Sequence, residues 1–71
     1  MIVLGYNLLN TENEEITATI QGEYEILTDG QDAFLQMIED LKDNENVKQF
    51  FWGIRLSPDE YQITAYRDNE V

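Results

Sequence analysis

The sequence predicts a single small α+β domain over residues 1–71, in which a four-stranded, mainly antiparallel sheet carries one helix on one face. Three observations predict this fold class. Apolar residues alternate with polar ones over residues 15–27, they recur at helical spacing over 32–43, and a turn signal, Ser57-Pro58-Asp59-Glu60, divides the last third into two strands. The order is therefore ββαββ, and a right-handed crossover from the second to the third strand gives the strand order 2-1-3-4.

The first two strands form a hairpin. The run from Ile2 to Leu9 has apolar residues on both faces, which predicts a central strand, and the loop from Asn10 to Glu14 follows it. In the second strand one face is apolar, and its residues are Ile16, Ala18, Ile20, Gly22, Tyr24 and Ile26. The polar face ends in Glu23 and Glu25, and Gly22 is a candidate position for a β-bulge.

A helix follows, from about Asp29 to Asp43. Thr28 and Gln31 have the spacing of a capping box at its start. The stripe that packs on the sheet consists of Phe34, Met37, Ile38 and Leu41. The opposite side consists of Asp32, Gln36, Glu39, Asp40 and Asp43. Acids near the C-terminal end of a helix oppose its dipole, so Asp40 and Asp43 point to a use other than helix stability.

The last third is a second hairpin, with strands Val47 to Leu56 and Tyr61 to Arg67, and Pro58 at the second position of a type I turn. The predicted pairs on the helix side are Leu56 with Tyr61, Ile54 with Ile63 and Trp52 with Ala65, so that Trp52 lies in the core beneath the helix. The predicted pairs on the open side are Phe51 with Tyr66 and Arg55 with Gln62.

Charge is the main functional signal. Fifteen Asp and Glu residues against four Lys and Arg give a net charge of −11, while 42% apolar residues argue for a folded domain. This charge opposes direct binding to nucleic acid or an anionic membrane and favours a basic protein partner. Solubility and adaptation to high salt are the alternatives. The N-terminal sequence has no basic region before its apolar run, and a cytoplasmic location is expected.

Catalytic chemistry is not expected. The chain has no His and no Cys, and its one serine, Ser57, suits the turn. The segment from Asp40 to Glu45 comes closest to a calcium loop, but it lacks the glycine and the late glutamate of an EF-hand. We therefore expect a non-enzymatic protein without a cofactor or a dedicated metal site.

Two surfaces are candidates for partner binding. The first is the acidic side of the helix, whose carboxylates recur at roughly one helical turn of 5–6 Å and can occupy a groove built for phosphates, with Glu23 and Glu25 as further candidates. The alternative reading is an ordinary solvated helix side. The second surface is Phe51, Arg55 and Tyr66 on the open face of the sheet, either a protein interface, for example in a homodimer, or a stabilising cross-strand pair.

In size, charge and α+β build the chain resembles small phage-encoded inhibitors, the anti-CRISPR proteins and the uracil-DNA glycosylase inhibitors, some of which act as DNA mimics. Composition and architecture alone carry this resemblance. It implies an inhibitor that acts in the host cytoplasm and blocks the basic nucleic-acid-binding site of a target protein. The alternative is a structural or adaptor protein that self-associates through the open sheet face.

Overall fold

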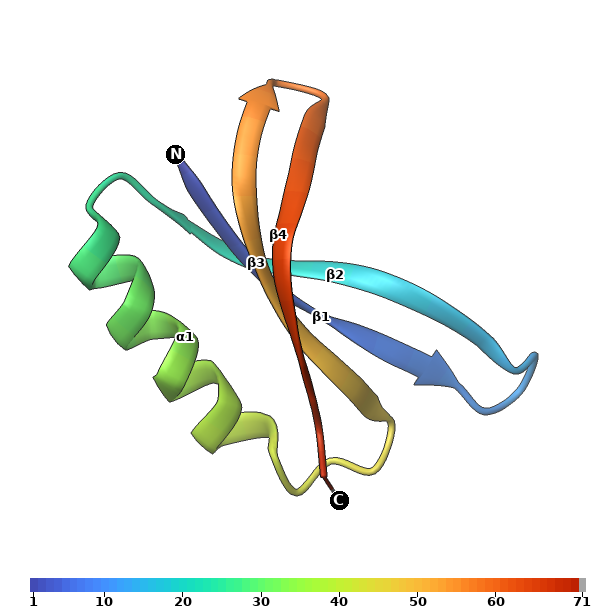
Figure 1. The fold of residues 1–71 in the computed structure, drawn as a ribbon. Coiled ribbons are helices and arrows are strands. Elements are labelled where there is room, and N and C mark those ends of the chain that lie inside the picture. Colours follow the sequence, from blue (N-terminus) through green and yellow to red (C-terminus); the bar gives the residue numbers. More distant parts are fainter. Residues whose placement is uncertain (71) are drawn as a thin grey trace.

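The computed structural model describes residues 1–70. Their element order is ββαββ, which confirms the predicted fold class. The elements are β1 (Ile2–Asn10), β2 (Glu15–Tyr24), α1 (Leu27–Leu41), β3 (Val47–Ser57) and β4 (Glu60–Asp68). All strand pairs are antiparallel and the sheet order is β2-β1-β3-β4, as predicted (Figure 1). No helix in this part of the chain is long and apolar enough to cross a membrane.

The core lies between α1 and one face of the sheet. Its buried side chains come from three elements: Met37 from the helix, Ile2 and Leu4 from β1, and Val47 and Phe50 from β3. Gly30 brings the start of α1 close to β1, because a Cβ at this position would lie 3.3 Å from Cγ2 of Ile2. The apolar stripe predicted for the helix is therefore confirmed as the side that packs on the sheet.

A bulge in β2 changes the predicted faces of this strand. Leu4 pairs with Gly22 but the next residue, Gly5, pairs with Ile20, so Gln21 is the extra residue. The bulge lies next to Gly22, as expected, and it reverses the alternation on its two sides. Gly22 and Tyr24 lie on the helix face. The residues before the bulge lie on the open face: Ile16, Ala18 and Ile20. The prediction of one continuous apolar face was wrong for this reason.

A second bulge changes the predicted register of the β3–β4 hairpin. Trp52 pairs with Ala65 and Phe51 with Tyr66, as predicted. Beyond them the register shifts by one residue, because Thr64 is extra. The predicted partners of Ile54 and Arg55 were therefore wrong, and the observed pairs are Ile54 with Gln62, Gly53 with Ile63 and Arg55 with Tyr61. Bulges increase strand twist, and the two hairpins cross at a wide angle in Figure 1.

The helix begins and ends two residues earlier than predicted, at Leu27 and Leu41. The capping box was wrong. Ile26 occupies the N-cap position in an extended conformation and makes no side-chain cap, and the amide of Gly30 donates the first helical hydrogen bond to the Ile26 carbonyl. Thr28 therefore lies inside the first turn. The early start places Gly30 over Ile2, where the close approach to the sheet occurs.

The open face of the sheet has a small buried cluster of its own. Val3 is 0% exposed and Phe51 is 1% exposed, although no helix lies over them. The ring of Phe51 covers the backbone of Gly5, since a Cβ on that glycine would lie 2.5 Å from Cζ of Phe51. Tyr61 stacks beside Phe51 at 6.4 Å between ring centroids, and Tyr66 meets the ring edge-on at 6.1 Å. Side chains of β4 thus shield this face from water.

Candidate functional site

The acidic side of α1 is solvent-exposed along its whole length. We use this name for five residues, all of them exposed: Asp32, Gln36, Glu39, Asp40 and Asp43. Four belong to the helix, and Asp43 lies two residues beyond its last residue. Helical spacing places them on the side opposite the buried stripe. The structure therefore places the five predicted residues on one surface.

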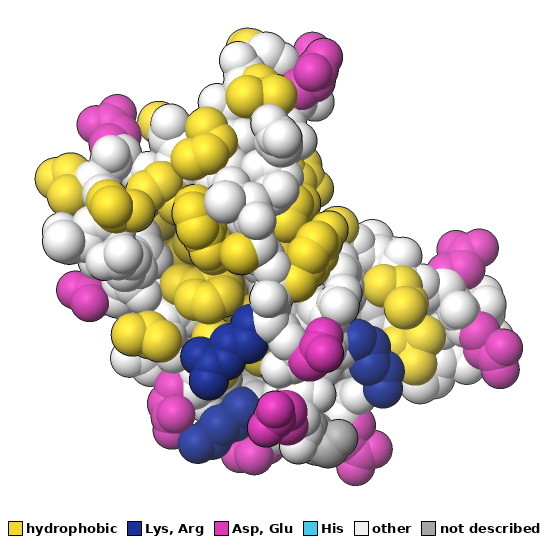
Figure 2. All heavy atoms as spheres, in the orientation of Figure 1, with side chains coloured by type: hydrophobic (Ala, Val, Ile, Leu, Met, Phe, Trp, Pro, Cys, Tyr) yellow, Lys and Arg dark blue, Asp and Glu magenta, His cyan; other side chains and the backbone are white. Residues whose placement is uncertain are grey.

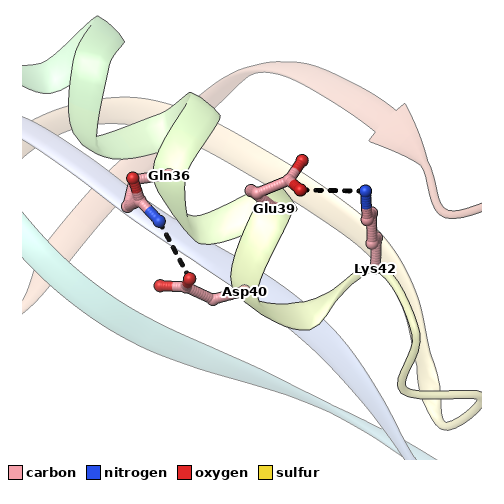
Figure 3. A network of polar contacts seen from close by, with 4 residues as sticks. All are labelled: Gln36, Glu39, Asp40 and Lys42. Atoms are coloured by element: carbon pink, nitrogen blue, oxygen red, sulfur yellow. Dashed lines mark hydrogen bonds and ion pairs between the residues drawn. The ribbon is translucent and has the colours of Figure 1, made fainter.

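Two polar contacts organise this surface, and Figure 3 shows both. Gln36 donates from Nε2 to Oδ1 of Asp40 at 2.9 Å, which holds that carboxylate one turn along the helix. Lys42 donates from Nζ to Oε1 of Glu39, also at 2.9 Å. The hydrogen bond and the charge of Glu39 together raise the pKa of Lys42 above its ordinary value of 10.5. Glu39 is thus partly neutralised by its neighbour.

The other carboxylates of this side make no ion pair within residues 1–70, although Lys42 lies close enough to Asp43 for its pKa to be raised by that charge as well. Within residues 1–70 the ion pairs are Lys42 with Glu39 and Arg55 with Glu23. Asp32, Asp40 and Asp43 take part in neither. The last turn of the helix also contains no basic residue. A partner that approaches this side of α1 therefore meets uncompensated negative charge.

The two glutamates predicted as additional candidates lie away from this surface. Glu23 pairs with Val3 on the open face of the sheet, where both Nε and Nη2 of Arg55 donate to its Oε1. Glu25 follows the end of β2 and lies in the bend before α1. Glu23 has its own cation and faces the other way. It does not extend the acidic side of α1.

The open-face candidates form a packed cluster rather than an exposed aromatic patch. Phe51 is buried, whereas Tyr66 is 57% exposed. The guanidinium of Arg55 lies over the ring of Tyr61 at 5.5 Å and pairs with Glu23, so it joins β3 to β2 across the open face of the sheet. Sequence reasoning placed Tyr61 on the other face. The reason is the one-residue shift at Thr64, which the alternation of apolar and polar residues in this edge strand does not reveal.

No three or more acidic side chains within residues 1–70 are grouped so that they could hold a metal ion. The arrangement as a whole is an exposed, negatively charged surface along one side of a helix. No family model, no curated protein and no solved structure matches the chain.

Proposed function

We propose that the protein is a small acidic inhibitor that binds a basic, nucleic-acid-binding protein through the acidic side of α1 and thereby blocks its DNA or RNA site. The observation that carries this proposal is the set of exposed carboxylates on one side of a helix, three of which make no ion pair within residues 1–70: Asp32, Asp40 and Asp43.

Spacing supports the proposal. Positions three or four residues apart on a helix repeat at about one turn, 5.4 Å. Asp32, Asp40 and Asp43 follow this repeat, with Gln36 between the first two. Phosphates on one DNA strand recur with an axial rise of about 3.4 Å, a comparable scale. Lys and Arg side chains arranged for phosphates can therefore meet these carboxylates, and the counterions released from the partner favour binding.

The placement of the acids also supports a role in binding. Asp40 is in the last turn of α1 and Asp43 follows it, where the helix dipole makes negative charge unfavourable. The net charge of −11 adds a long-range attraction for any cationic partner. In this proposal the protein acts in the host cytoplasm like an anti-CRISPR protein or an inhibitor of a DNA-repair enzyme, and it has no catalytic step.

One observation favours a second candidate, self-association through the open face of the sheet. Three large side chains remain exposed there, Ile16 at 61%, Ile20 at 36% and Tyr66 at 57%. A second copy would cover them. The repulsion between two copies that each carry −11 works against it, most strongly at low salt.

The test is affinity capture of nucleic-acid-binding proteins by the immobilised chain, eluted over about 0.05 to 1 M NaCl. The proposal expects a retained protein that elutes with salt and is displaced by added duplex DNA or RNA. A captured protein that stays bound at high salt and is not displaced by nucleic acid would contradict the proposal that the chain mimics nucleic acid. Recovery of the chain alone, as a dimer, would support the second candidate.

A further inference from the structure

An apolar groove lies beside the acidic side of α1, between the first half of the helix and the sheet. Its volume is about 510 Å³. Ile2 and Leu4 form the floor, Leu27 and Leu35 line the helix wall, and Trp52 lines the β3 wall. Figure 2 shows hydrophobic side chains gathered in this region, between the helix and the β3–β4 hairpin.

The apolar surface continues beyond the groove. The far half of the β3–β4 hairpin extends past the helix (Figure 1), and its helix-side residues Ile54 and Leu56 are 40% and 59% exposed. On the helix, Leu27 and Leu35 are exposed as well. A contiguous apolar area of this kind on a small domain marks an interaction site more often than scattered exposed residues do.

The charge around the groove indicates which kind of partner it favours. Asp32 is the one charged residue among the described residues that line it, and no Lys or Arg lines it. Asp32 also belongs to the acidic side of α1, so the groove and the carboxylates form one continuous surface. A second copy of this chain would bring another −11 to the site. A partner with basic residues next to apolar ones fits both parts.

The backbone around the groove indicates which secondary structure the bound partner segment has. β3 is a central strand, paired with β1 and β4, and α1 satisfies its own backbone. The groove therefore offers no free strand edge for an added strand, and side chains must fill it. Apolar side chains spaced at i, i+3 or i+4 and i+7 on a helix enter grooves of this kind.

We infer that the groove between α1 and β3 binds an amphipathic helix of a basic partner, with apolar residues in the groove and Lys or Arg beside Asp32. The inference takes the basic character of the partner from the proposed function and adds a second, apolar contact to it. Its test needs no nucleic acid, so the two proposals can fail separately.

Trp52 provides a direct readout because it is the one tryptophan of the chain and it lines the groove. The probe is a synthetic Trp-free peptide of about 18 Leu and Lys residues, long enough to form a helix and patterned with one apolar face. Saturable binding with a shift of the Trp52 emission to shorter wavelength is expected. A peptide of the same composition without an apolar face should leave the emission unchanged.

A matched pair of variants locates the contact. Leu35→Glu places a charge in the groove wall, and Ile16→Glu places one on the opposite sheet face at nearly the same exposure, 58% against 61%. Each adds one negative charge, so each strengthens the general attraction for the peptide equally. We expect Leu35→Glu to weaken peptide binding by at least about tenfold, and Ile16→Glu not to weaken it. Circular dichroism checks that both variants fold.

Three results would overturn the inference. The unpatterned peptide could give the same emission shift, or Leu35→Glu could bind as tightly as the parent chain. The chain alone could also be a dimer that Leu35→Glu converts to a monomer, and the occupant would then be a second copy. The patterned peptide could bind as expected while duplex DNA displaces no captured protein. That result would support the groove inference and contradict the proposed nucleic-acid mimic.

Discussion

The ring of Phe51 lies directly on Gly5 of the neighbouring strand, and a Cβ at Gly5 would come within 2.5 Å of Cζ of Phe51. The same Cβ would clash with the carbonyl oxygen of Thr19. The glycine thus makes room both for the ring and for the bulge in β2. This contact buries Phe51 on a face of the sheet that no helix covers.

Gly5→Ala should therefore be strongly destabilising. Because the added methyl group meets a backbone oxygen as well as the ring, neither neighbour can move away easily. We expect the free energy of unfolding to fall by about 3 kcal/mol, measured by urea denaturation. Gly22→Ala is the control, since its Cβ would meet only the side chain of Tyr24, at 3.3 Å. Equal losses in the two variants would contradict this account.

The ion pair between Arg55 and Glu23 should contribute to stability because it is more than half-buried and joins β3 to β2 across the open face of the sheet. In a double-mutant cycle with Arg55→Ala and Glu23→Ala, we expect a coupling energy of about 1 kcal/mol that decreases as salt is added. Arg55→Lys should restore only part of it, because Lys lacks the planar group that lies over Tyr61. A coupling energy of zero would show that the pair adds nothing.

The N-cap residue of α1 can be replaced by one that stabilises the helix more. Ile26 has the extended backbone that suits an N-cap, but its side chain cannot accept a hydrogen bond and is 59% exposed. Ile26→Ser should raise the free energy of unfolding by about 1 kcal/mol, because the serine oxygen can accept from a free amide of the first turn. Ile26→Ala lacks that oxygen and should not. Thermal unfolding that shows no difference between Ser and Ala would exclude a capping effect.

Lys42 gives a prediction on pH. Its pKa is raised in the folded chain by the hydrogen bond from its Nζ to Glu39 and by the charge of Glu39. A raised pKa means that the pair stabilises the fold fully below pH 10.5 and loses this effect as the pH rises through the higher, folded-state value. An NMR titration of the Lys42 side chain should show a lower pKa in Glu39→Ala. An unchanged titration would mean that the contact does not persist in solution.

Hydrophobic period and turn chemistry predicted the element order, the strand order and the buried stripe of α1. The bulges at Gln21 and Thr64 could not be predicted in this way. Each adds one residue to an edge strand, opposite a glycine of a central strand, Gly5 or Gly53, that makes room for it. A local pattern of apolar and polar residues contains no information about that pairing, so every face assigned beyond a bulge was reversed.

The residues of the candidate site were also predicted only in part. Helical spacing alone placed Asp32, Asp40 and Asp43 on one exposed side, because a helix side depends only on local sequence. The location of Glu23 depends on the sheet register, which helical spacing does not give. Its ion pair with Arg55 could therefore be identified only in the structure. The groove at Trp52 is lined by β1, α1 and β3 and depends on how these three elements pack, so no local pattern could predict it.

The central claim is that the acidic side of α1 binds a basic, nucleic-acid-binding partner. The most direct measurement compares capture of such a partner by two variants with the same change in net charge. One is Asp32→Lys with Asp40→Lys, and the other is Glu12→Lys with Glu15→Lys at the β1–β2 turn, which lies at the far end of the sheet from the helix (Figure 1).

We predict that the helix variant loses the partner and that the turn variant retains it, with duplex DNA displacing the partner from both the parent chain and the turn variant. Equal loss in both variants would show that net charge alone attracts the partner. Full retention by the helix variant would contradict the claim.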